Sequence, residues 1–282
     1  MKCAWTSFLS IIPQWMRSDV DALGAESLME LRLRLGRPPE LVTKTGNLTL
    51  KNTVKTEDLK FCINTASQYS PWSAWTSQFG YITAAGGHRL GLCGQASTQN
   101  CKMTGIRVPS SVCIRIARDF SGLVNDQRLL DGSVLIIGRP GAGKTTLLRD
   151  LIRFRSEHNF GSICVVDEKE EIFPFENNSF VFPPGPRTDV VSGCSKGQGI
   201  GCLLRNMGPH SIAVDEITAA EDCDSLLQAG RCGVDLVATA HAGSKQDLFN
   251  RMVYRPIIQS QIFDYLLILR DDKTWSLERM SP

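Results

Sequence analysis

Short apolar runs alternate with amphipathic segments through the second half of the chain. The runs that read as strands are residues 133–137, 162–166, 211–215, 234–240 and 265–269. Helical periodicity follows the first, third and fourth of them. Runs that stay apolar without alternation are typical of parallel strands covered by helices on both faces. The pattern predicts an α/β domain with a mostly parallel, doubly wound sheet over residues 123–282.

The first half of the chain has a different pattern. Apolar and charged residues alternate over 27–35, and a Pro-rich break separates them from a second strand-like stretch at 40–45. Residues 56–70 begin with a threonine whose hydroxyl can cap a helix. Further strand signals lie at 80–84, 87–93 and 111–117. We therefore predict a smaller α+β domain over residues 1–122.

The first sixteen residues are rich in Trp, Phe, Leu and Ile, but polar residues and Pro13 interrupt them and no small-residue cleavage pattern follows. An amphipathic helix packed on its own domain is favoured over a membrane anchor. No run approaches the roughly 20 apolar residues that span a bilayer. We expect any membrane association to be peripheral, through a partner or a surface helix.

Composition is that of a globular protein, with 42% apolar residues in 282. The net charge is +2, but residues 1–125 carry 14 Lys and Arg against 8 Asp and Glu. A basic front half suits nucleic acid, acidic lipid or an acidic protein face, although a solvated surface explains the same difference. The ten cysteines include no C-x-x-C pair, which excludes a zinc ribbon and a thioredoxin motif and favours a reduced, cytoplasmic setting.

Residues 138–145 form a complete phosphate-binding loop motif between a predicted strand and a predicted helix. Its glycines allow a tight turn in which consecutive N–H groups point at a phosphate, and the helix adds its positive N-terminal end. Lys144 is expected to contact the β- and γ-phosphates and the Thr145 hydroxyl to hold Mg²⁺. The residues predicted to bind the nucleotide are Gly138, Arg139, Pro140, Gly141, Ala142, Gly143, Lys144, Thr145 and Thr146. ATP is favoured over GTP because no Asn-Lys-x-Asp motif occurs.

Two pairs of acids follow predicted strands. Asp215 is expected to hold Mg²⁺ through water and Glu216 to polarise the attacking water. Asp167 and Glu168 have the same form, so they compete for the Mg²⁺ role or face the γ-phosphate and its water; the alternative is a pair of solvated acids. His241 follows the strand at 234–240 and is expected to sense the γ-phosphate at the carboxyl edge of the sheet, although a structural histidine is the alternative.

Phosphoryl transfer also favours an arginine on the developing γ-phosphate charge, often from another subunit or domain. The candidates are Arg89, Arg107 and Arg115 in the front half, Arg187 in the Pro/Gly-rich segment and Arg205 before the second acid pair. The sequence alone does not choose among them, and most are expected to be surface residues. The Pro/Gly-rich segment, residues 173–201, is predicted to be a long loop that is either disordered or functional.

The order of these motifs resembles that of the secretion and type IV pilus ATPases, a RecA-like phosphate-loop superfamily. The second motif and the "His box" of that superfamily are similar to 203–217 and 235–243, and Asp167 and Glu168 would lie in its "Asp box". Within it the chain is most similar to the stage III sporulation protein AA family. The stretches that carry this resemblance are 30–38, 87–94, 138–149, 165–168 and 185–190. The segment around 194–202, with two cysteines, departs from that pattern.

The resemblance implies a RecA-like ATPase domain preceded by a secretion-ATPase N-domain. It implies a homohexameric ATPase in the mother-cell cytoplasm, docked on membrane proteins of a transport channel between mother cell and forespore. It also implies that a front-domain arginine, matching Arg115 or Arg107, reaches the nucleotide. A nucleic-acid-dependent translocase is the main alternative, but no aromatic stacking platform or long basic run is evident. A small-molecule phosphotransferase is a third hypothesis for the function.

Overall fold

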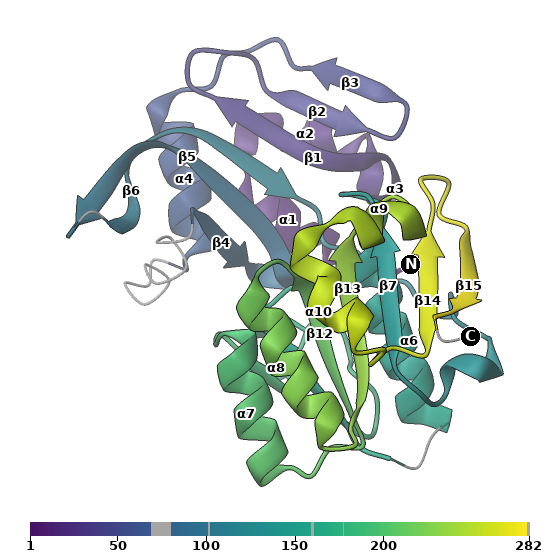
Figure 1. The fold of residues 1–282 in the computed structure, drawn as a ribbon. Helices are drawn as coiled ribbons and strands as arrows, with labels where there is room; N and C mark the ends of the chain where they lie inside the picture. Colours follow the sequence, from purple (N-terminus) through teal and green to yellow (C-terminus); the bar gives the residue numbers. More distant parts are fainter. Residues whose placement is uncertain (69–79, 101, 159–160, 177, 281–282) are drawn as a thin grey trace. The chain divides into compact units, whose positions relative to one another are not determined.

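The computed structural model describes residues 1–68, 80–100, 102–158, 161–176 and 178–280 (Figure 1). The chain divides into two compact units. Unit 1 is Met1–Asp119 with Glu176–Val181, and unit 2 is Phe120–Phe175 with Phe182–Pro282. The break after Asp119 lies three residues before the boundary expected at 122. The assignment of residues 176–181 to the first unit was not predicted from the sequence.

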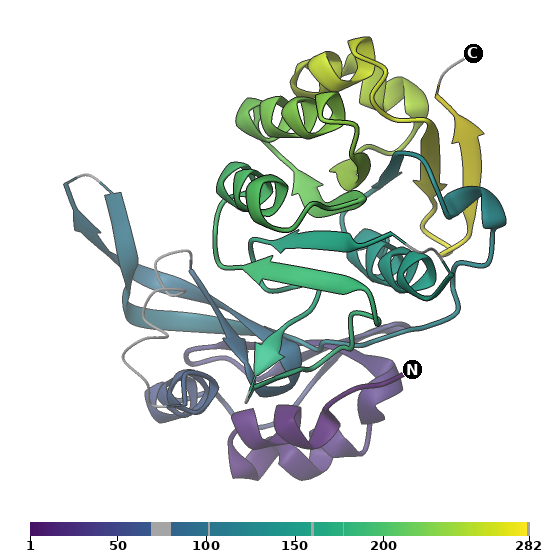
Figure 2. The ribbon, with the colours of Figure 1, turned by 90° about the horizontal axis from the view of Figure 1, so that it is seen from below.

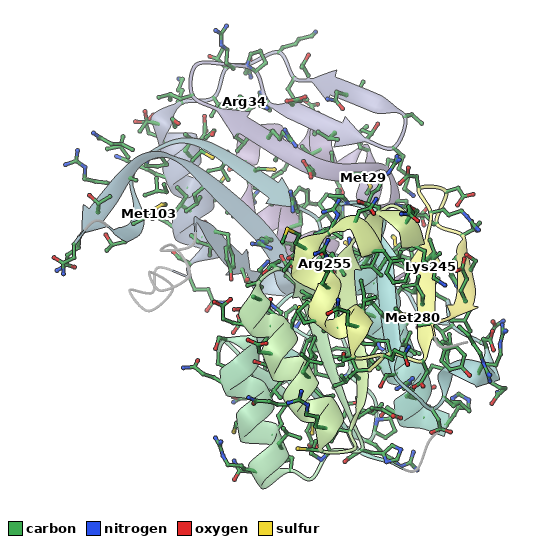
Figure 3. All side chains as sticks on the ribbon, in the orientation of Figure 1. Met29, Arg34, Met103, Lys245, Arg255 and Met280 are labelled. Atoms are coloured by element: carbon green, nitrogen blue, oxygen red, sulfur yellow. The ribbon has the colours of Figure 1, made fainter. Side chains whose placement is uncertain are left out.

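Unit 1 holds an antiparallel sheet in the order β3-β2-β1-β6-β5-β4. Its strands are β1 (Leu28–Arg34), β2 (Glu40–Thr43), β3 (Gly46–Thr49), β4 (Tyr81–Ala84), β5 (His88–Gln99) and β6 (Lys102–Arg115). The strand β3 was not predicted from the sequence, and β5 and β6 are longer than predicted. Among the described residues β4 and β1 pair with 88–91 and 111–115, so the rest of the β5–β6 hairpin is a two-stranded ribbon that carries the exposed Met103 (Figure 3).

Helices cover this sheet with apolar side chains. They are α1 (Trp5–Ile11), α2 (Gln14–Asp21), α3 (Gly24–Ser27) and α4 (Thr56–Ala66). Phe8 and Met16 are fully buried in one core with the strands, so the interpretation of the N-terminal segment as packed on its own domain is confirmed. Pro13 separates α1 from α2, where we had expected one helix. The last two residues of the helix predicted over 56–70 lie outside the described part of the chain.

Unit 2 holds a sheet in the order β11-β8-β12-β13-β7-β14-β15. Its strands are β7 (Val134–Gly138), β8 (Ile163–Asp167), β11 (Thr188–Ser192), β12 (Ser211–Ile217), β13 (Asp235–His241), β14 (Tyr265–Leu269) and β15 (Trp275–Arg279). All neighbours are parallel except the terminal pair β14 and β15. The predicted α/β class with a mostly parallel sheet is confirmed, although β11 and β15 were missed.

The helices of unit 2 are α6 (Lys144–His158), α7 (Lys196–Asn206), α8 (Ala220–Arg231), α9 (Lys245–Asn250) and α10 (Arg255–Gln259). Leu135 and Ile137 of β7 point into a core shared with α7, α8 and α10. Because side chains alternate along a strand, Val134 and Ile136 face the other side, where α6 contacts the sheet. Figures 1 and 2 show α7 and α8 side by side, as their contacts require. The sheet is thus covered on both faces.

The expectation of a loop over 173–201 was wrong for most of that segment. It contains the short strands β9 (Phe175–Glu176) and β10 (Ser179–Phe180), the edge strand β11 and the start of α7. Ser195 caps α7, and its hydroxyl accepts a hydrogen bond from the N–H of Gln198. The glycines of this segment favoured a loop and so hid this helix start in the sequence. Gly199 allows α7 to pack closely against β8, because a Cβ at this position would lie 2.5 Å from Cγ1 of Val166.

The start of unit 2 is fastened to α6. The buried Asp150 carboxylate accepts the N–H groups of Gly122, Leu123 and Val124 at 3.0, 2.6 and 2.8 Å. From the same helix, Arg153 donates to the carbonyl oxygen of Phe120 at 3.3 Å, and Arg155 donates to that of Leu129 at 2.7 Å. These bonds satisfy a run of backbone groups that lies outside regular secondary structure.

No helix in the described part of the chain is long and apolar enough to cross a membrane.

Candidate nucleotide site

The phosphate loop joins the end of β7 to the start of α6. Gly141 and Gly143 have φ values of +76° and +106°, which L-side chains rarely adopt. The buried Lys144 Nζ atom donates to the carbonyl oxygens of Gly138 at 3.0 Å and Arg139 at 3.2 Å. Burial lowers the pKa of Lys144, although nearby carboxylates oppose this. The loop therefore curls around the lysine that the motif predicts to contact phosphate.

A hydroxyl and a carboxylate meet beside this loop. Thr145 Oγ1 donates to Asp215 Oδ2 at 2.5 Å, and the Thr239 hydroxyl donates to Oδ1 of the same carboxylate. Hydroxyl and carboxylate oxygens suit Mg²⁺, either as direct ligands or as acceptors of hydrogen bonds from its bound water. The residues present at this point fit the expected metal. Thr239, from the middle of β13, fixes the carboxylate on its other side.

Glu216, His241 and Lys144 form a chain of hydrogen bonds. His241 Nδ1 lies 2.9 Å from Lys144 Nζ, and His241 Nε2 lies 2.6 Å from Glu216 Oε1. A protonated lysine only donates and an ionised glutamate only accepts, so Nδ1 accepts and Nε2 carries the proton. The histidine sits where the strand β13 ends. The expected sensor thus links the phosphate-loop lysine to the expected water-orienting acid.

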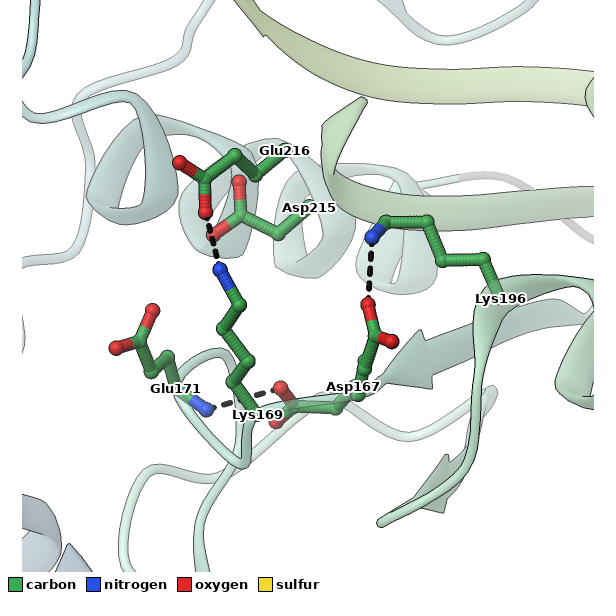
Figure 4. A pocket seen from close by; sticks show the side chains of 7 residues that line it. Asp167, Lys169, Glu171, Lys196, Asp215 and Glu216 are labelled. Carbon is green, nitrogen blue, oxygen red and sulfur yellow. Dashed lines mark hydrogen bonds and ion pairs between the residues drawn. The ribbon is translucent and has the colours of Figure 1, made fainter. Parts of the chain in front are cut away.

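Glu216 is also bound by Lys169, whose Nζ atom lies 2.5 Å from Oε2 (Figure 4). Burial alone would raise the pKa of Glu216, but hydrogen bonds from Lys169 and His241 and the charge of Lys169 lower it to about 2. The carboxylate is therefore ionised at neutral pH. It is suited to orient a water molecule and is a weak acceptor of a proton.

The backbone at Glu216 is unusual. Its φ is +54°, and the pairing of β12 with β13 is interrupted between Val214 and Ile217. Its N–H donates to Thr239 Oγ1 at 2.8 Å. A left-handed conformation at a non-glycine residue costs about 1 kcal/mol or more and is concentrated at functional sites. The irregularity turns the Glu216 side chain toward His241 rather than along the strand.

The first acid pair has divided roles. Asp167, 1% exposed, accepts the N–H groups of Glu171, Ile172 and Phe173 at 2.9, 3.0 and 2.8 Å. Burial raises the pKa of Asp167 to about 6 against the effect of these N–H groups. The carboxylate thus shapes the turn after β8, a role that the sequence did not predict. Its contact with Mg²⁺ stays a prediction.

Glu168 lines a small pocket together with the other acids of the site. Its Oε2 atom accepts from the buried Lys196 Nζ at 2.6 Å. The pocket is lined by Asp167, Glu168, Lys169, Glu171, Lys196, Asp215 and Glu216. Both acid pairs therefore border one cavity, each with a lysine bound to its glutamate. The role of Glu168 toward the γ-phosphate stays a prediction.

The outer side of the phosphate loop contacts the turn between β14 and β15. Lys273 Nζ donates to the carbonyl oxygens of Gly141 at 2.8 Å and Ala142 at 3.0 Å. Arg139 forms an exposed ion pair with Asp271 at 3.2 Å. Within the loop Ala142 is buried and Pro140 exposed, while Thr146, in the first turn of α6, is partly exposed. The turn that leads into the unpredicted strand β15 therefore braces the loop.

The predicted arginines are not gathered at this site within unit 2. Arg205 lies in the last turn of α7, which leads into the amino end of β12, whereas the phosphate loop follows the carboxyl end of β7. The structure therefore does not bring Arg205 to the site within one chain. Arg115 belongs to unit 1, where its Nε atom pairs with Glu30 at 3.3 Å and its side chain is exposed. Its contact with nucleotide stays a prediction.

Three residues of the site were missed from the sequence. Thr239 is a fully buried polar residue in an apolar strand, two positions before His241, and that placement was a usable signal. Lys169 lies in a run of acidic residues, and such a charged run predicts a solvated surface. Lys196 lies in the segment expected to be a loop. Neither lysine carries a motif, so only the fold brings them to the acids.

Comparison with known proteins gives a consistent family. A family model described as sporulation stage III, protein AA, matches residues 12–277. Stage III sporulation protein AA of Bacillus subtilis (strain 168) is 34% identical over 272 residues, which are 92% of this chain and 89% of the relative. Protein SEEDLING PLASTID DEVELOPMENT 1 of Arabidopsis thaliana is 26% identical over 83% of this chain and 33% of its own length.

Solved structures share the fold. The Legionella pneumophila ATPase DotB superposes with a TM-score of 0.60 at 15% identity, covering 95% of this chain and 80% of that one. The pilus retraction motor PilT with bound ADP superposes with a TM-score of 0.61 at 16% identity, covering 89% and 76%. At these identities the likeness establishes the arrangement of the strands and helices, which matches the predicted RecA-like class.

Proposed function

Because the chain belongs to the sporulation stage III protein AA family, we propose that it is a Mg²⁺-dependent ATPase that works as a secretion-type motor on a sporulation channel. One observation carries the enzymatic part. Lys144 and Thr145, at the start of α6, are bonded to His241 and Asp215 at the carboxyl ends of β13 and β12. A phosphate loop facing an acid that can hold Mg²⁺ and an acid that can orient water is the arrangement that phosphoryl transfer to water needs.

The reaction is the attack of water on the γ-phosphorus of ATP, which breaks the bond to ADP and releases phosphate. Lys144 and the N–H groups of the loop bind the phosphates, and Glu216 orients the attacking water. Thr145 would hold Mg²⁺ directly and Asp215 through water, and the bound metal would neutralise charge on the β- and γ-phosphates. We propose that His241 contacts the γ-phosphate as a hydrogen-bond donor.

The motor part of the proposal rests on the family and on the related folds. PilT is a retraction motor and DotB an ATPase, and a motor function in this chain explains why an ATPase unit is joined to a separate α+β unit. We propose a homohexamer on the cytoplasmic face of a membrane, bound to membrane proteins of the channel between mother cell and forespore. In such a ring an arginine of unit 1, Arg115 or Arg107, completes the site.

The enzymatic proposal is tested by two substitutions. Lys144→Ala is expected to abolish binding of a fluorescent ATP analogue, whereas Glu216→Gln is expected to bind it and to hydrolyse ATP about 100-fold more slowly or worse. Glu168→Gln is the matched comparison. Normal turnover by Glu216→Gln together with loss in Glu168→Gln would move the water-orienting role to Glu168. Normal turnover by Lys144→Ala would overturn the proposed site.

The assembly is tested with the Glu216→Gln chain, which is expected to keep ATP bound. Light scattering of that chain is expected to show a ring with ATP and Mg²⁺. In a chain that keeps Glu216, Arg115→Ala is expected to lower hydrolysis while leaving nucleotide binding intact. A fully active monomer would refute the shared site. Strong stimulation of hydrolysis by single- or double-stranded DNA would instead support the nucleic-acid translocase.

A further inference from the structure

Three potential metal ligands lie at the amino edge of the unit 2 sheet. Asp131 precedes β7, His210 precedes β12 and Asp235 begins β13. One ligand atom from each lies within 4.8 Å of the other two. The strands β12, β13 and β7 are neighbours and parallel, so their starts fall together at this edge. The nucleotide site uses the opposite, carboxyl ends of the same strands.

The backbone holds two of these residues in place. The N–H of His210 donates to Ser162 O at 3.0 Å, and the N–H of Asp235 donates to His210 O at 3.1 Å. The N–H of Gly132, next to Asp131, donates to Asp235 Oδ2 at 2.9 Å. One carboxylate oxygen of Asp235 is thus oriented by the chain that carries Asp131. A site whose ligands are placed before the ion arrives loses less entropy on binding.

The local charge favours a cation. Three acids, Asp131, Asp235 and Asp264, act electrostatically on the buried guanidinium of Arg155. Arg155 donates to the carbonyl oxygens of Leu129 and Gly132, each at 2.7 Å. Among the residues that the structure describes, these three acids act on one buried cation, whose two shortest hydrogen bonds are to main-chain oxygens.

We propose that Asp131, His210 and Asp235 bind a divalent first-row transition-metal ion. Two carboxylates with one imidazole suit Mn²⁺, Fe²⁺ or Zn²⁺, and the imidazole disfavours Mg²⁺ and Ca²⁺, which prefer oxygen ligands. Water completes the coordination because Asp131 and His210 are exposed. An ion here ties the starts of three neighbouring strands, so it stabilises the fold. This site is independent of nucleotide and of the proposed ATPase activity.

The test uses Mn²⁺ and the full chain without nucleotide, after removal of metals with EDTA. Mn²⁺ is chosen because the ten cysteine thiols would take up Zn²⁺. Loss of the free Mn²⁺ signal in electron paramagnetic resonance is expected to show one ion per chain and to be accompanied by a rise in Tm. His210→Ala and Asp131→Asn are each expected to weaken binding about tenfold or more and to remove the rise in Tm.

Matched controls separate this site from others. His158→Ala removes an exposed histidine and Asp224→Asn an exposed acid elsewhere in unit 2, and both are expected to bind Mn²⁺ as the unsubstituted chain does. Asp215→Asn is also expected to keep binding, since it alters only the nucleotide edge. Unchanged binding in His210→Ala with intact circular dichroism would overturn the proposal. Loss of binding in Asp215→Asn alone would place the ion at the nucleotide site and overturn it as well.

Discussion

Lys169 Nζ lies 2.5 Å from Glu216 Oε2, which puts a cation on the carboxylate proposed to orient the attacking water. The second oxygen of that carboxylate is bonded to His241. Both acceptors of Glu216 are therefore engaged by protein groups. A water molecule oriented by Glu216 has to compete with one of them, and the lysine, on a turn and partly exposed, is the one more easily displaced.

We expect Lys169→Met to raise basal ATP hydrolysis about threefold to tenfold while leaving nucleotide affinity unchanged. The substitution frees one oxygen of Glu216 and removes the charge that lowers its pKa, so the carboxylate becomes the better base. Initial rates with and without Mg²⁺ at saturating ATP measure the effect. Lys169→Arg should behave like the unsubstituted chain because it keeps the charge.

The matched control for Lys169 is Lys245→Met. Lys245 is similarly exposed and pairs with an acid that belongs to neither acid pair, Glu278, at 3.7 Å. We expect its rate to be unchanged. A rate at least tenfold lower in Lys169→Met would contradict the expectation and assign the lysine a direct contact with the γ-phosphate.

The stability that Glu216 contributes should depend on pH. Its folded-state pKa is about 2, below the ordinary value of 4.5, so the ionised form is favoured by folding. The contribution is therefore complete above about pH 4.5 and is lost as the pH falls toward 2. The difference in urea midpoint between the unsubstituted chain and Glu216→Gln should be constant from pH 7 to pH 5 and shrink below that. A difference that grows on acidification would refute the assigned shift.

Thr239→Val tests the support beneath the acid pair. The substitution keeps the shape but removes the hydroxyl that donates to Asp215 and accepts the N–H of Glu216. We expect a loss of about 1–3 kcal/mol in the free energy of unfolding, because a partly buried N–H loses its partner. Hydrolysis should fall as well. Thr239→Ser, which keeps the hydroxyl, should retain most of the activity, and equal losses in both variants would show that packing rather than the hydroxyl matters.

Gly199→Ala tests the contact that α7 makes with the sheet. The added Cβ would stand 2.5 and 2.9 Å from the two Cγ atoms of Val166, so we expect a loss of about 1–3 kcal/mol of stability. Gly201→Ala is the control on the same helix. Its Cβ would meet no atom closer than 3.5 Å, and alanine is the better helix former, so a gain of up to about 1 kcal/mol is expected. Chemical unfolding of both variants measures these changes.

The phosphate loop, the parallel sheet and the acid pair after β12 could be predicted because each depends on local sequence. Gly141 and Gly143 need their backbone conformation whatever surrounds them, and the apolar strands signal burial on both faces. The helix α7 could not be predicted in this way. Gly199 lowers the helix propensity of this segment. A glycine is needed there because a Cβ would clash with Val166, which is distant in the sequence.

The lysines of the site show the same limit. Lys169 contacts Glu216 because it lies in the turn that Asp167 stabilises by accepting its N–H groups. Lys196 contacts Glu168 because it is the first residue of α7, which begins next to this carboxylate. Neither residue belongs to a motif with fixed spacing. The charges that set the pKa of Glu216 are thus a property of the fold. A sequence pattern identifies the carboxylate but not the groups that hold it.

The hydrogen bonds of Asp150 give the entry into unit 2 a mechanical meaning. They fasten residues 122–124 to α6, and α6 begins at Lys144. The segment that enters unit 2 and the helix that presents the phosphate-contacting lysine are therefore held as one piece. A displacement of α6 would move residues 122–124 with it, and loss of the Asp150 carboxylate would release them.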